Sequence, residues 1–453
     1  MRIDVVGAGL AGSEAALQLA DRGVAVRLFE MRPRRMTPAH HSGLAAELVC
    51  SNSLKSEKPA SAAGMLKSEL AALGSHLLAV ARECRVAAGG ALAVDRERFA
   101  QAVTARIEAH PLIEMVREEA TCAPEGSDAV ILATGPLTSP ALAAWLEGVT
   151  GSGYLSFYDA AAPIVMADSL DYGKLFRQSR YEDGEGDYLN APFTKEEYEA
   201  FARELVAAER VVLRDFESKD LFQACQPIEE IARKGFDAPR FGPLKPVGLT
   251  DPATGRRPWA ALQLRAEDAH GESYNLVGFQ TNLTFAEQKR VFRMIPGLEQ
   301  AEFARFGVMH RNTFIDAPHL LAHDLSLACA PGEEPVFIAG QLAGTEGYCE
   351  AIMSGLVAAL GAYARVRGQE ALSLPPETAF GALLAYATDP ATEGYQPMHV
   401  NFGIMPPLEK PVRNKGARYE AYARRGAEAL EVWLAELRER GIVPSAEKTP
   451  GEA

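Results

Sequence analysis

The chain has 453 residues, which is long enough for two or three domains that each bury a core of their own. Hydrophobic residues make up 47% of the chain and charged residues 23%, so global disorder is excluded. The formal net charge of −14 means that the average surface repels polyanions, and any nucleic-acid site must be a local basic patch.

The opening segment predicts one compact strand–helix–strand unit. Its parts are a strand over Ile3 to Val6, a helix over Gly12 to Asp21 and a strand over Val24 to Phe29. Between the first strand and the helix lies a glycine-rich turn, where backbone N–H groups at a helix start can bind a pyrophosphate. The turn residues are Gly7, Ala8, Gly9, Leu10, Ala11 and Gly12.

An acidic residue follows the second strand of this unit. Glu30 comes 18 residues after Gly12, close to the spacing expected for a carboxylate that accepts hydrogen bonds from a ribose. The turn and the carboxylate together predict a dinucleotide site.

Two further apolar runs end in glycine turns. The run Ala129 to Ala133 is followed by Thr134 and Gly135, and the run Pro335 to Ala339 is followed by Gly340 and Gln341. Such runs are typical of strands in a parallel sheet, and a ligand is expected at their carboxyl ends. These extra elements favour FAD over NAD as the bound cofactor.

A long helix is predicted from about Tyr348 to Val366, and its N-terminus near Gly344 to Gly347 could stabilise the negative charge of a reduced flavin. Gly347 and Tyr348 are therefore also expected at the cofactor. We find no second glycine-rich βαβ unit, so NAD(P)H is expected to visit the flavin only transiently.

The middle of the chain differs in composition, with charged, aromatic and Pro-rich stretches and a strand-like piece over Tyr274 to Phe279. We predict an α/β protein with a Rossmann-like, doubly wound FAD-binding domain and an inserted, smaller α+β domain. The FAD-binding domain is expected at residues 1–156 and 298–445, the inserted substrate domain at 157–297, and a polar tail at 446–453, after a helix over Glu420 to Arg440.

The cysteines lie far apart and form no CxxC pair. The N-terminus lacks a basic region before an apolar stretch, and no run approaches the 18 or so apolar residues of a membrane span. A reducing cytoplasm without membrane attachment is the expected location. The six cysteines are Cys50, Cys84, Cys122, Cys225, Cys329 and Cys349.

Two of these cysteines have polar neighbours. Cys50 precedes good N-cap residues, and a thiol at a helix start has its thiolate favoured by the helix dipole. Cys225 lies beside both carboxylates and cations, so local sequence does not give the sign of its pKa shift. From the residues alone, an inert buried thiol is the favoured interpretation of both. The other four are expected to be core thiols.

Basic residues gather in four local clusters, each of which fits a solvated face, although several together could hold RNA phosphates. They are Arg32 with Arg34 and Arg35, Arg233 with Lys234, Arg256 with Arg257, and Lys410 with Arg413, Lys415 and Arg418. His310, Arg311 and Asn282 are polar groups at the expected return from the inserted domain. No histidine has metal-ligand spacing, so no metal is expected.

Seven segments, ordered over some 400 residues, carry a resemblance to a known family. They are Val5–Glu14, Glu47–Lys55, Ala133–Ser139, the Cys225-Gln-Pro-Ile-Glu229 segment, Phe241–Leu249, Gly307–Phe314 and Pro397–Gly403. The chain thereby resembles the folate- and FAD-dependent tRNA (uracil-5-)-methyltransferases of the TrmFO (Gid) family. Departures from the family pattern stand at Gln226, Asn282 and Thr284 and concern substrate contacts.

The resemblance implies methylation of carbon 5 of the T-loop uridine in tRNA, with methylenetetrahydrofolate and NAD(P)H as co-substrates. It also implies that Cys50 and Cys225 both belong to the active site. Cys225 is expected to add to carbon 6 of uracil, and Cys50 to take the carbon-5 proton or to guard the flavin. These roles could be exchanged, and the oligomeric state is left open.

Two alternatives remain from the sequence. One is another flavin oxidoreductase, for folate or amine oxidation without RNA, which suits the acidic charge better. The other is a tRNA-binding folding factor in which FAD is structural.

Overall fold

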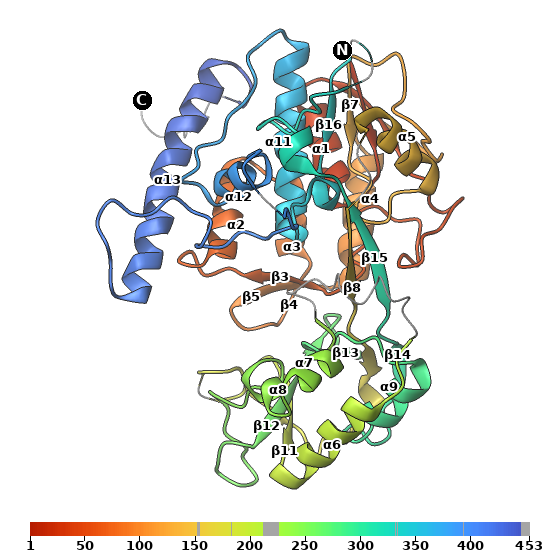
Figure 1. Cartoon of the computed structure of the whole chain (residues 1–453), viewed down its shortest axis with the longest axis vertical. Helices are drawn as coiled ribbons and strands as arrows, with labels where there is room; N and C mark the ends of the chain where they lie inside the picture. Colours follow the sequence, from red (N-terminus) through yellow and green to blue (C-terminus); the bar gives the residue numbers. More distant parts are fainter. Residues whose placement is uncertain are drawn as a thin grey trace.

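The computed structural model describes residues 1–151, 155–182, 184–211, 226–330, 332, 334–392 and 394–444. Two units are visible in Figure 1, an upper one that contains both described chain ends and a lower one built from the middle of the chain. Cys225 and the expected tail at 446–453 lie outside the described residues.

A five-stranded parallel sheet forms the centre of the upper unit. Its strands, in sheet order, are β16 (Val336–Ile338), β7 (Ala129–Leu132), β1 (Arg2–Val6), β2 (Ala25–Phe29) and β6 (Ile113–Val116). Every neighbouring pair runs parallel. The sheet grows from β1 first toward β2 and β6 and then toward β7 and β16, so the strand order reverses at β1. In such sheets ligands bind at the carboxyl ends of the strands where the order reverses.

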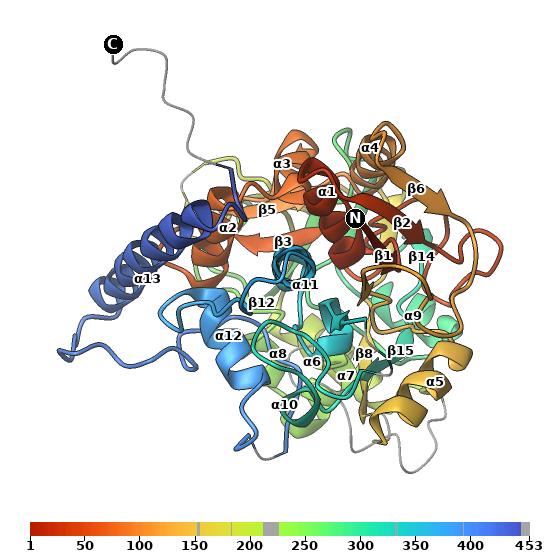
Figure 2. The ribbon, with the colours of Figure 1, turned by 90° about the horizontal axis from the view of Figure 1, so that it is seen from above.

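Helices and a small sheet complete the upper unit. The helices are α1 (Leu10–Asp21), α2 (Ala62–Ala72), α3 (His76–Glu83), α4 (Arg96–Glu108), α5 (Pro140–Thr150), α10 (Ala317–Leu320), η3 (Gly340–Ala343), α11 (Tyr348–Val366), α12 (Ala379–Ala387) and α13 (Lys415–Glu439). The small antiparallel sheet contains β3 (Ser53–Ser56), β5 (Ala91–Val94) and β4 (Arg85–Val86). Seen from above, α1, α4 and α11 gather on one side of β1 and β2 (Figure 2). The prediction of an α/β fold is confirmed.

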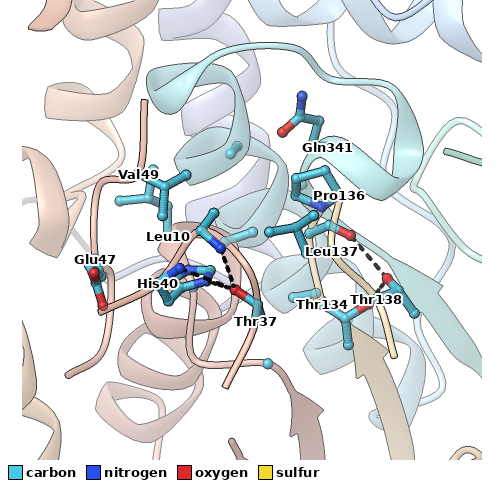
Figure 3. Close-up of a pocket in the computed structure, with 18 of the residues that line it drawn as sticks. Leu10, Thr37, His40, Glu47, Val49, Thr134, Pro136, Leu137, Thr138 and Gln341 are labelled. Atoms are coloured by element: carbon cyan, nitrogen blue, oxygen red, sulfur yellow. Dashed lines mark hydrogen bonds between the residues drawn. The ribbon is translucent and has the colours of Figure 1, made fainter. Parts of the chain in front are cut away.

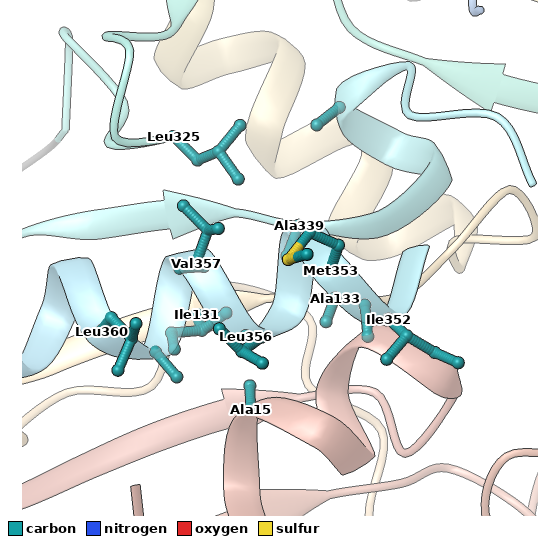
Figure 4. Packing of buried hydrophobic residues seen from close by; sticks show 14 of the residues in the cluster. Ala15, Ile131, Ala133, Leu325, Ala339, Ile352, Met353, Leu356, Val357 and Leu360 are labelled. Atoms are coloured by element: carbon teal, nitrogen blue, oxygen red, sulfur yellow. The ribbon is translucent and has the colours of Figure 1, made fainter. Parts of the chain in front are cut away.

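The core between sheet and helices depends on small residues. Ala15 of α1, Ile131 of β7 and Leu356 of α11 lie together in Figure 4. At Gly355 an added Cβ would be 2.0 Å from the Ala11 carbonyl oxygen, so only glycine lets α11 approach α1 this closely.

Among the described residues, α11 is the one helix long and apolar enough to cross a membrane, which the sequence did not lead us to expect. Since 78% of this stretch is buried inside the protein, α11 is a core helix here.

The lower unit is built on an antiparallel six-stranded sheet with its own core. Its strands, in sheet order, are β10 (Phe176–Arg177), β11 (Leu189–Phe193), β12 (Ala260–Ala266), β13 (Ser273–Leu276), β9 (Ile164–Met166) and β14 (Phe303–Arg305). Its helices are η1 (Ala167–Ser169), α6 (Lys195–Ala207), α7 (Ile228–Lys234), α8 (Ala238–Phe241) and α9 (Phe285–Phe292). A ribbon of β8 (Leu155–Ala160) and β15 (Met309–Phe314) joins it to the upper unit (Figure 1). The expected boundary at residue 297 falls before β14.

Local signals explain where most helices begin. The side chains of Ser61, Ser75, Asp95, Ser139, Thr194, Thr284, Thr378 and Asn414 each accept a hydrogen bond from a backbone N–H of the first turn. The cap at Asn414 starts α13 five residues before the predicted Glu420. The helix expected after Cys50 is wrong, because Ser53–Ser56 pairs as a strand with β5 instead.

Candidate functional site

A cavity of about 380 Å³ opens where the strand order of the parallel sheet reverses. Residues after β1, β2 and β7 line it, together with the N-terminal ends of α1 and α11. Figure 3 shows two facing walls, with Thr37, His40, Glu47 and Val49 on one side and Thr134 to Thr138 on the other.

The glycine-rich turn forms the floor of this cavity. At Gly7, with φ +101°, an added Cβ would be 2.6 Å from the Ala133 carbonyl oxygen, and at Gly12 it would be 1.8 Å from the Gly7 oxygen. Both glycines are therefore required by backbone packing. At Gly9, which lines the cavity and caps α1, an added Cβ would meet no atom within 4 Å. Gly9 thus leaves open space next to the N–H groups of α1, which fits a pyrophosphate.

Glu30 lies at the same end of the cavity and is 6% exposed. It accepts hydrogen bonds from the Ala8 N–H at 3.0 Å and from the N–H and guanidinium of Arg32. Burial opposes ionisation of Glu30, but the hydrogen bonds and charge of Arg32 outweigh it and lower its pKa. A carboxylate held ionised beside the glycine turn fits a ribose acceptor.

The opposite wall follows the ends of β7 and β16. The Thr134 and Thr138 hydroxyls lie 2.6 Å apart, and Gly135, Gly340 and Gln341 line the cavity beside them. Gly340, with φ +76°, faces Ala11 of α1, where an added Cβ would be 3.2 Å from the Ala11 Cβ. The Gln341 amide donates to Glu346, which also lines the cavity.

At the far end, α11 points its N-terminus at the cavity, with Gly347 as its N-cap residue. Lys55 lines the cavity here, and its ammonium nitrogen lies 3.5 Å from the carboxylate of buried Glu350. Lys55 has φ +65°, an uncommon conformation for a residue with a side chain. Glu350 partly neutralises the Lys55 ammonium, so the positive character of this end, which suits an anionic ring, comes mainly from the N-terminus of α11.

The Cys50 loop closes this end of the cavity. The hydroxyl of partly buried Tyr348 accepts hydrogen bonds from the N–H groups of Cys50 and Ser51, both at 3.0 Å. Burial raises the pKa of Tyr348, so its hydroxyl is neutral. The thiol is partly exposed and lines the cavity. Cys50 is not at the start of a helix, since the chain continues as β3 after it.

Three arginines hold this loop instead. Arg96 donates to the carbonyl oxygens of Leu48 and Cys50 at 2.9 and 3.2 Å, and Arg305 donates to that of Val49. Arg265 donates to Asn52 and Ser51.

Arg96 and Arg305 interact electrostatically with Cys50, whereas Glu267 balances Arg96. Burial, followed by the charge of Arg96, lowers the pKa of Arg305. The loop therefore places its thiol in a cationic environment, which favours thiolate.

The described residues on either side of the Cys225 segment are anchored close to the cavity. The Ile228 N–H donates to the Gln280 oxygen at 2.7 Å, and the Val211 N–H donates to the Asn282 oxygen at 2.9 Å. Gln280 itself lines the cavity. Cys225 lies outside the described residues, as do the side chains of His310 and Arg311.

The remaining cysteines divide into two pairs. Cys84 and Cys349 are buried as expected, and burial raises the pKa of Cys349 to about 11. The core expectation is wrong for Cys122 and Cys329, which are exposed because they lie in loops.

The first basic cluster is only partly a solvated face, because Arg32 is buried whereas Arg34 and Arg35 are exposed. Arg32 is 2% exposed and pairs with Glu30 and Glu47, while Arg34 and Arg35 pair with Glu118 and Glu119. Over the described ranges, no group of three or more His, Cys, Asp or Glu could hold a metal ion.

Most of the predicted cofactor residues come together in this one cavity. Ala8 and Gly12 lie behind its surface, where Ala8 binds Glu30 and Gly12 packs on Gly7. Sequence reasoning missed the wall formed by Thr37, His40, Glu47 and Val49. The Thr37 hydroxyl lies 2.6 Å from His40 Nδ1, and burial, with the charge of Arg32, lowers the His40 pKa to about 4. The Glu47–Lys55 segment was the signal, since Glu47 and Val49 belong to it.

The parallel sheet, its glycine turn and the carboxylate after β2 define a dinucleotide-binding protein of the Rossmann-like class. The family described as "Glucose inhibited division protein A" matches residues 2–370. A protein of Moorella thermoacetica named methylenetetrahydrofolate--tRNA-(uracil-5-)-methyltransferase TrmFO is 55% identical over 432 residues, covering 95% of this chain and 97% of its own. One of the same name from Bacillus subtilis is 51% identical over 429 residues, covering 95% and 98%. The chain belongs to this TrmFO family.

A solved structure shares the fold at low identity. GidA of Aquifex aeolicus superposes with a TM-score of 0.68 at 16% identity, covering 97% of this chain and 76% of that chain. This likeness supports the predicted flavoprotein-type α/β fold.

Proposed function

We propose that this protein transfers a one-carbon unit from methylenetetrahydrofolate to carbon 5 of a uridine in tRNA and reduces it to a methyl group, with FAD as its cofactor. The observation that carries the proposal is the position of Cys50, a thiol among arginines at one end of a dinucleotide-type cavity. The near full-length relatives bear the name of this activity.

The cavity residues fit FAD in one orientation. The N–H groups at the start of α1 would bind the pyrophosphate above Gly9, and Glu30 would accept hydrogen bonds from the adenosine ribose. The flavin ring would then lie toward Gly347 and Cys50, where the N-terminus of α11 and Lys55 would stabilise its reduced, anionic form. When bound, the flavin supplies the hydride that turns a methylene into a methyl group.

The chemistry of uracil explains why two thiols are useful. Carbon 5 of uracil is a weak nucleophile, and addition of a thiolate at carbon 6 produces an enolate whose carbon 5 attacks an electrophilic one-carbon unit. A base then removes the carbon-5 proton, and the amine that carried the one-carbon unit leaves, which gives an exocyclic methylene on the uracil. Addition of hydride to this methylene gives the methyl group and expels the thiolate from carbon 6. We assign the addition to Cys225 and the proton transfer to Cys50, and the reverse assignment is the alternative.

Arg96, Arg265 and Arg305 support this chemistry through the backbone. They fix the loop from Leu48 to Asn52 by hydrogen bonds, so that the Cys50 thiol keeps one position. Water is limited by the apolar character of Val49, Leu10 and Leu137, which line the cavity around it.

Three finer points belong to the proposal. The uridine is that of the T-arm, which must leave its stack to reach the thiol. NAD(P)H supplies the electrons that reduce the flavin, and the reaction takes place in the cytoplasm. The inserted domain, expected at 157–297, contacts the RNA.

The proposal is tested by incubating purified protein with unmodified tRNA, methylenetetrahydrofolate and NADPH. Nucleoside mass spectrometry should detect 5-methyluridine, and the product should be lost in Cys50→Ser and in Cys225→Ser. Flavin turnover without modified base would instead support an oxidoreductase that does not act on RNA. Cys122→Ser, which changes an exposed thiol outside the cavity, serves as the control.

A further inference from the structure

Three phenylalanines form a stack on the lower unit, next to the ribbon that leads to the upper one. The Phe303 and Phe306 rings lie 5.0 Å apart at 14°, and the Phe306 and Phe285 rings lie 4.8 Å apart at 15°. Phe303 packs against the core of the lower unit, whereas Phe285 at the other end is 54% exposed. A nearly parallel column of rings thus runs from the core to the surface.

The column stands beside the candidate active site. Arg305, just before Phe306, donates to the Val49 carbonyl oxygen, and Gly307, just after it, packs on Ala161. Val49 and Ala161 both line the cavity. Figure 1 shows β14, which carries Phe303, and α9, which carries Phe285, directly below the β8–β15 ribbon.

The position of the exposed ring is fixed by hydrogen bonds. The buried Gln288 side chain of α9 donates to the Gly307 oxygen and accepts from the Gly307 N–H, both at 2.8 Å. This pair ties α9 to the residue next to Phe306, so Phe285 cannot easily leave the column. The Thr284 side chain also caps α9 directly before Phe285.

A cation lies on the same helix face as the exposed ring. Lys289 is one turn after Phe285, and residues four apart are neighbours on a helix surface. Lys289 is exposed, and no ion pair of it occurs within the described ranges. The adjacent Arg290, by contrast, is neutralised by Glu204 and Glu287.

We propose that the Phe303–Phe306–Phe285 column is a stacking platform for an unpaired base of the tRNA next to the uridine that is modified, with Lys289 contacting the phosphate of that nucleotide. A flipped uridine leaves its neighbours without a stacking partner, and an exposed aromatic face replaces one at little conformational cost. A column extending from the core is rigid, and the residues on either side of its middle ring, Phe306, contact residues that line the cavity. The inference rests on the proposed function, because it assumes an RNA substrate.

The test uses the full-length flavoprotein and an unmodified tRNA transcript. Phe285→Leu keeps an apolar side chain but removes the ring, and it should raise both the Kd and the KM for tRNA about 5- to 100-fold, with kcat within about twofold. Phe285→Trp should keep both constants within about twofold of wild type. Lys289→Gln should reduce the slope of log Kd against log salt by about one.

The matched control is Phe241→Leu, since Phe241 is 81% exposed on the same unit and outside the column. It should leave tRNA binding unchanged. Wild-type affinity in Phe285→Leu overturns the inference, and so does an equal loss in Phe241→Leu or a failure of Phe285→Trp to restore binding.

The formation of 5-methyluridine by the wild-type protein tests the proposed function separately from the stacking platform. A wild-type protein that makes 5-methyluridine while Phe285→Leu binds tRNA normally overturns the platform alone. A wild-type protein that makes no 5-methyluridine overturns the proposed function, whatever the column binds.

Discussion

The two ends of the cavity are built in different ways. At the pyrophosphate end, the shape comes from the backbone of one continuous turn, where Gly7 and Gly12 leave no room for a Cβ. At the thiol end, it comes from side chains that reach the Cys50 loop from α4, β12 and β14, over more than 250 residues of sequence. The first end depends on local conformation and the second on how the two units meet.

The largest effect is expected from a change at the backbone-built end. Gly12→Val should abolish flavin binding, because an added Cβ would be 1.8 Å from the Gly7 oxygen and the turn could not form. Flavin absorbance per protein should fall at least about tenfold, since even a small displacement of the α1 N–H groups weakens pyrophosphate binding. Gly148→Ala in α5, where an added Cβ meets nothing within 4 Å, is the control and should keep its flavin.

A change of the thiol alone should separate chemistry from cofactor binding. Cys50→Ser should retain flavin but lower the rate of 5-methyluridine formation by about 100-fold or more, the range typical of a lost proton-transfer group. Single-turnover assays with pre-reduced enzyme measure this rate. Loss of flavin in this variant would show that the thiol end also holds the cofactor.

Removal of Arg96, one of the three arginines that bond the Cys50 loop, should lower both the stability of the protein and the rate of methylation. Arg96→Met leaves Glu267, which is 6% exposed, without its partner at 3.2 Å, and should cost about 3 to 5 kcal/mol of unfolding free energy. Urea unfolding measures this cost. Adding Glu267→Gln should restore much of the stability. It should not restore the methylation rate, because the Cys50 loop still lacks the hydrogen bonds from Arg96. A full recovery of rate would contradict the positioning role.

A smaller, pH-dependent effect is expected between α2 and α12. Glu69 of α2 is buried and accepts hydrogen bonds from the Ala379 and Phe380 N–H groups of α12 at 2.6 and 3.1 Å, and burial raises its pKa to about 7. Its ordinary value is 4.5, so between these pH values the folded protein retains a proton that the unfolded chain has lost.

The stabilisation from Glu69 is therefore fully present below pH 4.5 and is lost as the pH rises through about 7. Relative to Glu69→Gln, wild-type stability should fall by up to about 3 kcal/mol between pH 4.5 and 8, at about 1.4 kcal/mol per pKa unit. Denaturant titrations at several pH values measure it. A constant difference between the two proteins would show that Glu69 does not titrate in this range.

The parallel-sheet unit could be predicted closely because its signals are local. The helix Tyr348–Val366 has the predicted bounds, and β1, β2, β7 and β16 lie within one or two residues of their predicted positions. Apolar runs followed by glycine turns are set by backbone conformation and burial, which neighbouring residues determine. The expected inserted domain at 157–297 was inferred only from a change in composition, and β14 extends its sheet to Arg305.

The Cys50 loop shows where local reasoning fails. Ser51 and Ser53 are good N-cap residues, yet the chain continues as β3 because β5 offers a strand partner. The two serines instead accept hydrogen bonds from backbone N–H groups within the loop. Pairing with a distant strand outweighs a local capping preference, and sequence patterns do not record which strand is near.

The sequence by itself determined the dinucleotide-binding turn, the carboxylate after β2 and the family, since each depends on residues close together or on a pattern along the whole chain. Only the tertiary structure decided that Arg96, Arg265 and Arg305 meet at the Cys50 loop, that Thr37 and His40 form a cavity wall, and that three phenylalanines stack on the lower unit. Contacts between side chains distant in sequence depend on how the elements pack, and no local propensity specifies that arrangement.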